Sequence, residues 1–67
     1  MTRDEWIAQF AAELGVEPPD GDTVETLLAL AGTAAHASER TAAPIACYLV
    51  GLAGRPPAEA AELAENV

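Results

Sequence analysis

Five prolines divide this 67-residue chain into four segments, and no other feature restricts its possible folds as strongly. Pro18 and Pro19 are consecutive, as are Pro56 and Pro57. Each pair ends a preceding helix, because proline lacks an amide donor and forces the residue before it toward an extended conformation. Pro44 stands alone, and we expect it in the first turn of a helix, where backbone amides have no helical partner to lose. The chain is therefore predicted to form short, separate helices.

Capping residues place the ends of these helices. Thr2 and Glu5 have the spacing of a capping box, and Gly15 suits the left-handed residue that ends a helix. Asp22 is expected to cap the second helix and Thr41 the third. The predicted fold is all-α, a single domain over residues 1–67 formed by a compact bundle of four short helices at about residues 3–14, 22–39, 42–53 and 57–66.

The apolar pattern is regular in the first predicted helix and interrupted in the second. The apolar residues of the first helix recur at intervals of three and four, which places them on one stripe: Trp6, Ile7, Phe10, Ala11 and Leu14. Gly32 lies inside the second helix, where a glycine costs about 1 kcal/mol relative to alanine. This glycine either permits a close approach between helices or is merely tolerated.

Eleven carboxylates against three arginines, with no lysine, give the chain a formal net charge of −8. Nucleic-acid binding requires a cationic surface that releases counterions, and three scattered arginines do not form one. The same charge disfavours an anionic membrane surface, and the longest apolar stretch, residues 42–53, is far shorter than the ~20 residues that span a bilayer. Asp4 and Glu5 stand where a signal peptide would begin its apolar core, so we expect a cytoplasmic protein.

Catalysis and metal binding have little support in the residue types present. His36 is the only histidine and Cys47 the only cysteine, and they fall on different predicted helices, whereas zinc needs three or four ligands. Cys47 lies among apolar residues, which indicates a packed core thiol rather than an activated thiolate. The carboxylates are expected on solvated faces, and the chain has no glycine-rich phosphate loop. We therefore predict no catalytic residue, no metal, no cofactor and no enzymatic activity.

One polar cluster stands out at the junction of the second and third helices. It contains the only histidine and one of the three arginines, and its candidate recognition residues are His36, Glu39, Arg40 and Thr41. One interpretation is an anion- or partner-recognition site, with Arg40 as donor and the start of the third helix adding its dipole. The other interpretation is structural: Arg40 pairs with Glu39 or with a carboxylate of the first helix, while His36 caps or packs at the helix end.

The third predicted helix has no polar face, and such a helix must be covered on all sides. It is either a central core helix wrapped by the other three, or part of an interface with a second copy or another protein. The candidate interface residues are Tyr48, Leu49 and Leu52, with Tyr48 as the anchor. A chain this short has little core of its own, so we expect self-association through this helix, strengthened as salt screens the negative charge.

Several segments resemble a small domain of unknown function from high-GC bacteria. They are Asp4–Ile7, Leu14–Val16 with Pro18 and Pro19, Ala35–Ile45 around Ser38-Glu39-Arg40, and Tyr48–Gly51, within a resemblance that runs from Asp4 to Leu63. Domains of this kind are found alone or attached to nucleotidyltransferases similar to molybdenum-cofactor guanylyltransferases. The resemblance therefore implies an accessory role near the maturation of that cofactor. It implies no catalysis here, because the glycine-rich nucleotide motif of such transferases is missing from this sequence.

The sequence thus supports two functional hypotheses of different classes. The leading one is a non-catalytic helical interaction module that forms a homodimer or docks on a nucleotidyltransferase-like enzyme, which the resemblance connects to molybdenum-cofactor biosynthesis. The alternative is a small anion- or nucleotide-binding regulatory protein that uses His36 and Arg40. An exposed apolar surface favours the first hypothesis, and stabilisation of the protein by phosphate-like anions would favour the second.

Overall fold

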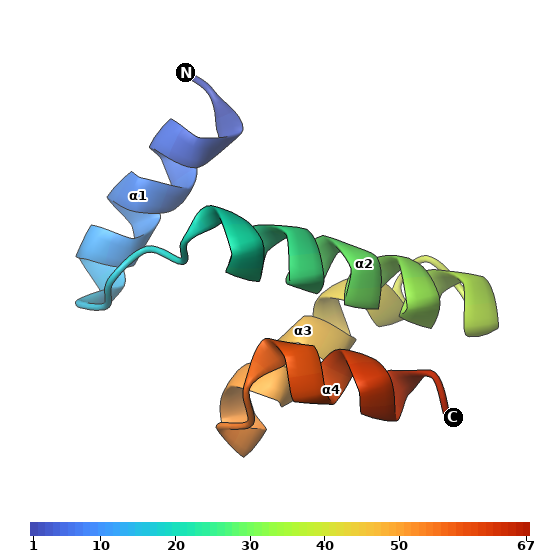
Figure 1. Ribbon diagram of the computed structural model, residues 1–67. Coiled ribbons are helices and arrows are strands. Elements are labelled where there is room, and N and C mark those ends of the chain that lie inside the picture. The colour runs from blue at the N-terminus through green and yellow to red at the C-terminus, as the bar shows by residue number, and fades with distance from the viewer.

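The computed structural model describes all 67 residues and contains four helices and no strand (Figure 1). The helices are α1 (Arg3–Leu14), α2 (Gly21–Ala37), α3 (Ala42–Ala53) and α4 (Pro57–Ala64). The prediction of an all-α fold with four short helices is confirmed. The predicted bounds of α1 and α3 agree with the structure to the residue, whereas those of α2 and α4 differ at their ends.

The two ends of α1 are fixed by the predicted residues. The Thr2 hydroxyl accepts a hydrogen bond from the Glu5 amide at 3.1 Å, and the Thr2 amide donates to Glu5 Oε1 at 2.8 Å, which completes a capping box. At the other end, Gly15 adopts a left-handed conformation with φ of 77°, which few side-chain-bearing residues tolerate. These two local signals are enough to define the helix.

The cap of α2 differs from the prediction. Asp20, not Asp22, is the N-cap, and its carboxylate accepts a hydrogen bond from the Thr23 amide at 2.8 Å. Its backbone is extended, with φ of −76° and ψ of 174°, which is the conformation of a capping residue, whereas Asp22 already lies inside the helix. The choice of Asp22 was wrong because both aspartates precede the apolar run, and only backbone geometry separates them.

The later helix ends also need correction. α2 ends at Ala37 rather than at residue 39, because the backbone of Ser38 leaves the helical region while its hydroxyl donates to the Ala34 carbonyl at 2.9 Å. α4 ends at Ala64 rather than at residue 66. Thr41 occupies the cap position of α3 as predicted, but it makes no side-chain capping bond; its hydroxyl donates to Glu39 Oε1 at 3.3 Å instead.

The arrangement of the helices centres on α2, which packs against both α3 and α4. α1 has no extensive interface with any other helix and lies at one end of the molecule, joined to α2 by residues 15–20 (Figure 1). Only Ala11 and Leu30 are buried, and the radius of gyration is 12.2 Å. A compact chain of this length has a radius of gyration of about 11 Å, so α1 extends the molecule.

Candidate docking surface

α3 has its small side chains turned inward and its large ones turned outward. The partly buried side carries residues spaced three and four apart, which are Ala43, Ala46, Cys47 and Val50. The opposite side carries four large apolar side chains, here called the α3 face, which are Ile45, Tyr48, Leu49 and Leu52. Tyr48 is 65% exposed and Leu52 69% exposed. The interpretation of this helix as a core helix wrapped on all sides is therefore wrong.

Next to this face, the structure has an open apolar groove of about 590 Å³, here called the α3 groove. It lies between the C-terminal half of α2, the start of α3 and the end of α4, and it is lined by Thr33, Ala34, Ala37, Ser38, Thr41, Ala42, Ile45, Ala46, Leu49, Ala64 and Val67. Ile45 and Leu49 belong to both surfaces, so the α3 face and the α3 groove are continuous. Five of the eleven lining residues are alanine, which leaves room for larger side chains from outside.

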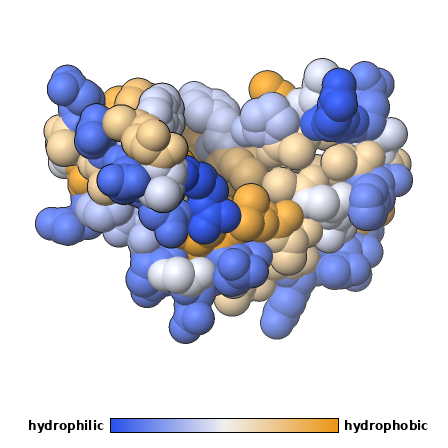
Figure 2. All heavy atoms as spheres, turned by 90° about the horizontal axis from the view of Figure 1, so that it is seen from above, coloured by the Kyte–Doolittle hydropathy of each residue, from blue (hydrophilic) through white to orange (hydrophobic).

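Seen from above, the molecule has a hollow floored by hydrophobic side chains and bordered by hydrophilic ones (Figure 2). Apolar surface of this kind favours contact with another protein over permanent exposure to water. A polar border around an apolar centre is also the usual composition of a protein interface.

A second apolar surface lies on α1, and we call Trp6, Phe10 and Leu14 the α1 stripe. Large apolar side chains like these usually pack in the core of a helical domain. Here Trp6 is 52% exposed and Phe10 is 47% exposed. The ring centroids of Trp6 and Phe10 are 5.0 Å apart with their planes tilted by 33°. Periodicity identified this stripe in the sequence, but it gave no functional role to the stripe, because periodicity shows which residues share a face and not what covers that face.

The polar cluster between α2 and α3 does not form a joint site. α2 ends at Ala37, so His36 and Arg40 do not share a helix. Both side chains are exposed, and Arg40 makes no ion pair and no side-chain hydrogen bond. The interpretation in which Arg40 pairs with Glu39 or with a carboxylate of α1 is therefore wrong. Of the four predicted recognition residues, only Thr41 lines the α3 groove.

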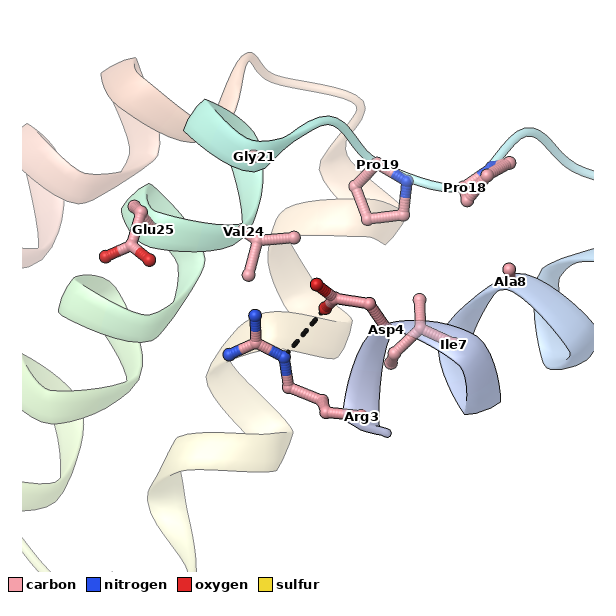
Figure 3. A pocket seen from close by; sticks show the side chains of 9 residues that line it. All are labelled: Arg3, Asp4, Ile7, Ala8, Pro18, Pro19, Gly21, Val24 and Glu25. Atoms are coloured by element: carbon pink, nitrogen blue, oxygen red, sulfur yellow. Dashed lines mark hydrogen bonds and ion pairs between the residues drawn. The ribbon is translucent and has the colours of Figure 1, made fainter. Parts of the chain in front are cut away.

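The other two arginines, Arg3 and Arg55, each form an ion pair with a carboxylate. Arg3 Nε lies 2.9 Å from Asp4 Oδ1, and this hydrogen bond raises the pKa of the Arg3 guanidinium. The pair borders a cleft of about 270 Å³ between α1 and the start of α2, with Glu25 across it (Figure 3). Arg55 pairs with Glu59 one helical turn away. The cleft therefore offers an anion no unpaired arginine, and Arg40 is the one free guanidinium of the chain.

The structure shows no cluster suited to metal chemistry and no helix able to cross a membrane. No three His, Cys, Asp or Glu side chains lie close enough to one another to hold a metal ion. Cys47 is half-buried on the inner side of α3, less enclosed than the predicted core thiol. Every helix is too short or too polar to span a bilayer.

Comparison with known families agrees with the resemblance seen in the sequence. The whole chain, residues 1–67, matches the family described as domain of unknown function DUF6457. The chain belongs to this family. No curated protein matches the chain, and no solved structure matches it either. Family membership fixes the extent of the domain in this chain, so the function must be argued from the surfaces described above.

Proposed function

We propose that this chain is a non-catalytic helical interaction module that docks on a protein partner through the α3 face. The observation that carries the proposal is the inverted packing of α3, which directs Ile45, Tyr48, Leu49 and Leu52 to solvent and keeps the small residues inside. A domain selected only for its own stability would gain by the opposite orientation, because burying one Leu or Ile side chain contributes about 1.5–3 kcal/mol.

Tyr48 is the natural anchor of this surface. A tyrosine combines a large apolar ring with a hydroxyl that can bond at the edge of an interface, and it loses little rotamer freedom on binding. Leu52 lies one turn further along the same side of α3 and extends the contact. The net charge of −8 favours a partner whose docking region is apolar at its centre and carries arginine or lysine at its rim.

The resemblance to domains attached to molybdenum-cofactor guanylyltransferase-like enzymes makes such a nucleotidyltransferase the first enzyme to test as a partner. In this proposal the module has an accessory role in molybdenum-cofactor biosynthesis, and the enzyme supplies all catalysis. A second copy of the chain is the other partner that the same surface can accept.

The test is co-expression of the chain with the guanylyltransferase-like enzyme of its own host, followed by measurement of the dissociation constant of the purified pair. Leu52→Gln should abolish co-elution, because it places an amide at the centre of the α3 face. The matched control is Leu28→Gln, since Leu28 is 51% exposed but lies on α2, outside the α3 face. Equal binding by both variants would show that the α3 face is not the docking surface.

A second candidate function rests on Arg40, which has no carboxylate partner within the chain. We propose, as the alternative, a regulatory protein that binds a phosphate-like anion or a nucleotide through Arg40 and His36. A guanidinium free of intramolecular pairs is available for a bidentate hydrogen bond to phosphate. Phosphate or nucleotide should then raise the melting temperature of the wild type but not of Arg40→Gln. An unchanged melting temperature in both proteins would contradict the anion-binding role.

A further inference from the structure

The exposed surface of this chain is larger than its mass requires. Its accessible area is 5141 Å², whereas a compact monomer of 6.9 kDa has about 4,000 Å². The excess is roughly 1,100 Å², and one partner in a stable protein interface buries about 800 Å². One copy therefore exposes as much extra surface as it would contribute to a dimer.

Two apolar regions of the exposed surface carry side chains of complementary size. The α1 stripe presents three large side chains, Trp6, Phe10 and Leu14. Five of the eleven residues that line the α3 groove are alanines, which are Ala34, Ala37, Ala42, Ala46 and Ala64. Helix surfaces interdigitate best when large residues of one oppose small residues of the other. The two regions therefore fit each other better than either fits itself.

Within one chain the two regions do not meet. α1 has no extensive interface with α3 or α4, and residues 15–20 hold it at the far end of α2 (Figure 1). Consecutive prolines, Pro18 and Pro19, make that connector stiff. The stripe of one copy can consequently reach a groove only on another molecule.

We propose that two copies form a symmetric dimer in which the α1 stripe of each copy packs on the α3 face and into the α3 groove of the other. The proposal rests on the proposed docking function of the α3 face and names a second copy as its occupant. In a two-fold dimer the contact between stripe and groove occurs twice, so both apolar regions of both chains are covered. A dimer that paired α3 only with α3 would leave Trp6 and Phe10 of both copies in water.

The net charge of −8 on each copy opposes this association. Repulsion between exposed charges is screened beyond about 8 Å at physiological salt, whereas apolar contact is not screened. The dimer should therefore be tighter in high salt than in low salt. An interface held by ion pairs would have the opposite dependence.

Trp6 is the only tryptophan, so its fluorescence reports directly on the α1 stripe. Sedimentation of the full chain over a range of concentrations should show a monomer–dimer equilibrium, and the Trp6 emission should move to shorter wavelength along the same concentration curve. A monomer at every concentration, with unshifted emission in high salt, would overturn the proposed dimer.

Two variants distinguish this arrangement from other dimers. Phe10→Gln alters the stripe but keeps the Trp6 reporter, and Leu52→Gln alters the α3 face. Each variant alone should dimerise about tenfold more weakly or worse, because both contacts of its homodimer are damaged. Leu28→Gln should associate like the wild type, and circular dichroism should show that all variants keep their helices.

The outcomes separate the dimer from the docking function. If Phe10→Gln dimerises like the wild type, the α1 stripe is not part of the interface and the proposal is overturned. If the wild type is monomeric and the Leu52→Gln variant does not bind the guanylyltransferase-like enzyme, the docking function holds without the dimer. If the wild type is monomeric and the Leu52→Gln variant binds the enzyme as tightly as the wild type does, both the dimer and the docking function of the α3 face are contradicted.

Discussion

The rings of Trp6 and Phe10 stack at a centroid distance of 5.0 Å on α1, one helical turn apart and both about half exposed. Aromatic pairs of this geometry contribute about 0.5–1.5 kcal/mol beyond the area they bury. The pair exists before any partner arrives, so its side chains lose less conformational freedom when they are covered. A preformed aromatic pair on an outlying helix is thus suited to recognition.

The stability of the domain should depend on Leu30 more than on any other leucine, because Leu30 is 3% exposed and is the only large side chain that is buried. We expect Leu30→Ala to destabilise the fold by about 2–5 kcal/mol. Leu28→Ala, on the same helix but half exposed, should cost about 1 kcal/mol or less. Urea denaturation followed by circular dichroism measures both, and similar losses for the two variants would mean that Leu30 is not the centre of the core.

Replacing Gly32 in α2 and Gly54 at the end of α3 with alanine should change the stability of the protein in opposite directions. A Cβ built at Gly32 meets no atom within 4 Å, so Gly32→Ala should stabilise the protein by up to about 1 kcal/mol. Gly54 has φ of 71°, so Gly54→Ala should destabilise it by about 1 kcal/mol or more. Thermal unfolding tests the pair. A loss of stability in Gly32→Ala would indicate that another chain approaches α2 closely at this position.

Acid should destabilise the helix starts. The pKa of Asp20 is lowered because its carboxylate accepts hydrogen bonds from Thr23, chiefly from the backbone amide, and Thr2 lowers the pKa of Glu5 in the same way. A carboxyl whose pKa is lower in the folded state stabilises the fold at pH values above its unfolded pKa of about 4. That contribution is lost as pH falls through the lower folded pKa.

Melting temperatures measured from pH 6 to pH 3 should therefore fall, and Asp20→Asn should weaken the fall. Asparagine caps a helix about as well as aspartate at neutral pH but has no carboxyl to protonate. Asp22→Asn is the matched control, because the Asp22 side chain accepts no capping hydrogen bond. The same pH dependence in both variants would show that the Asp20 cap does not contribute.

Arg40→Ala should leave the free energy of unfolding within about 0.5 kcal/mol of the wild type, because the guanidinium is exposed and unpaired. The structural interpretation of the cluster required a larger loss. Chemical denaturation decides between these outcomes. A loss well above this range would reveal an ion pair of Arg40 that forms in solution.

Local signals in the sequence were sufficient to place most helix ends. The capping box of Thr2 and Glu5 and the left-handed glycines Gly15 and Gly54 each act within one helical turn, so their effect can be derived without the rest of the fold. The start of α2 was missed because Asp20 and Asp22 are chemically alike and lie two residues apart. Their difference depends on the path of the connector before them.

The candidate surface was only partly predictable for a related reason. The sequence shows that α3 has no polar side, but which side faces α2 depends on packing between helices. Tyr48, Leu49 and Leu52 were expected at an interface, and the structure leaves all three exposed. The interpretation in which Arg40 pairs with Glu39 or with a carboxylate of α1 was wrong, because the directions of exposed side chains between α2 and α3 are not determined by any local pattern.

The connector formed by residues 15–20 acts as a fixed spacer between the α1 stripe and the rest of the molecule. Because Pro18 and Pro19 restrict its backbone, the distance and angle between the α1 stripe and the rest of the molecule are set before any encounter. A partner, or a second copy, must match that spacing to contact both surfaces at once. If the α1 stripe and the α3 face bind as proposed, selectivity depends partly on these six connector residues. A flexible replacement would keep every residue of the two surfaces and still lower the effective concentration of one surface at the other.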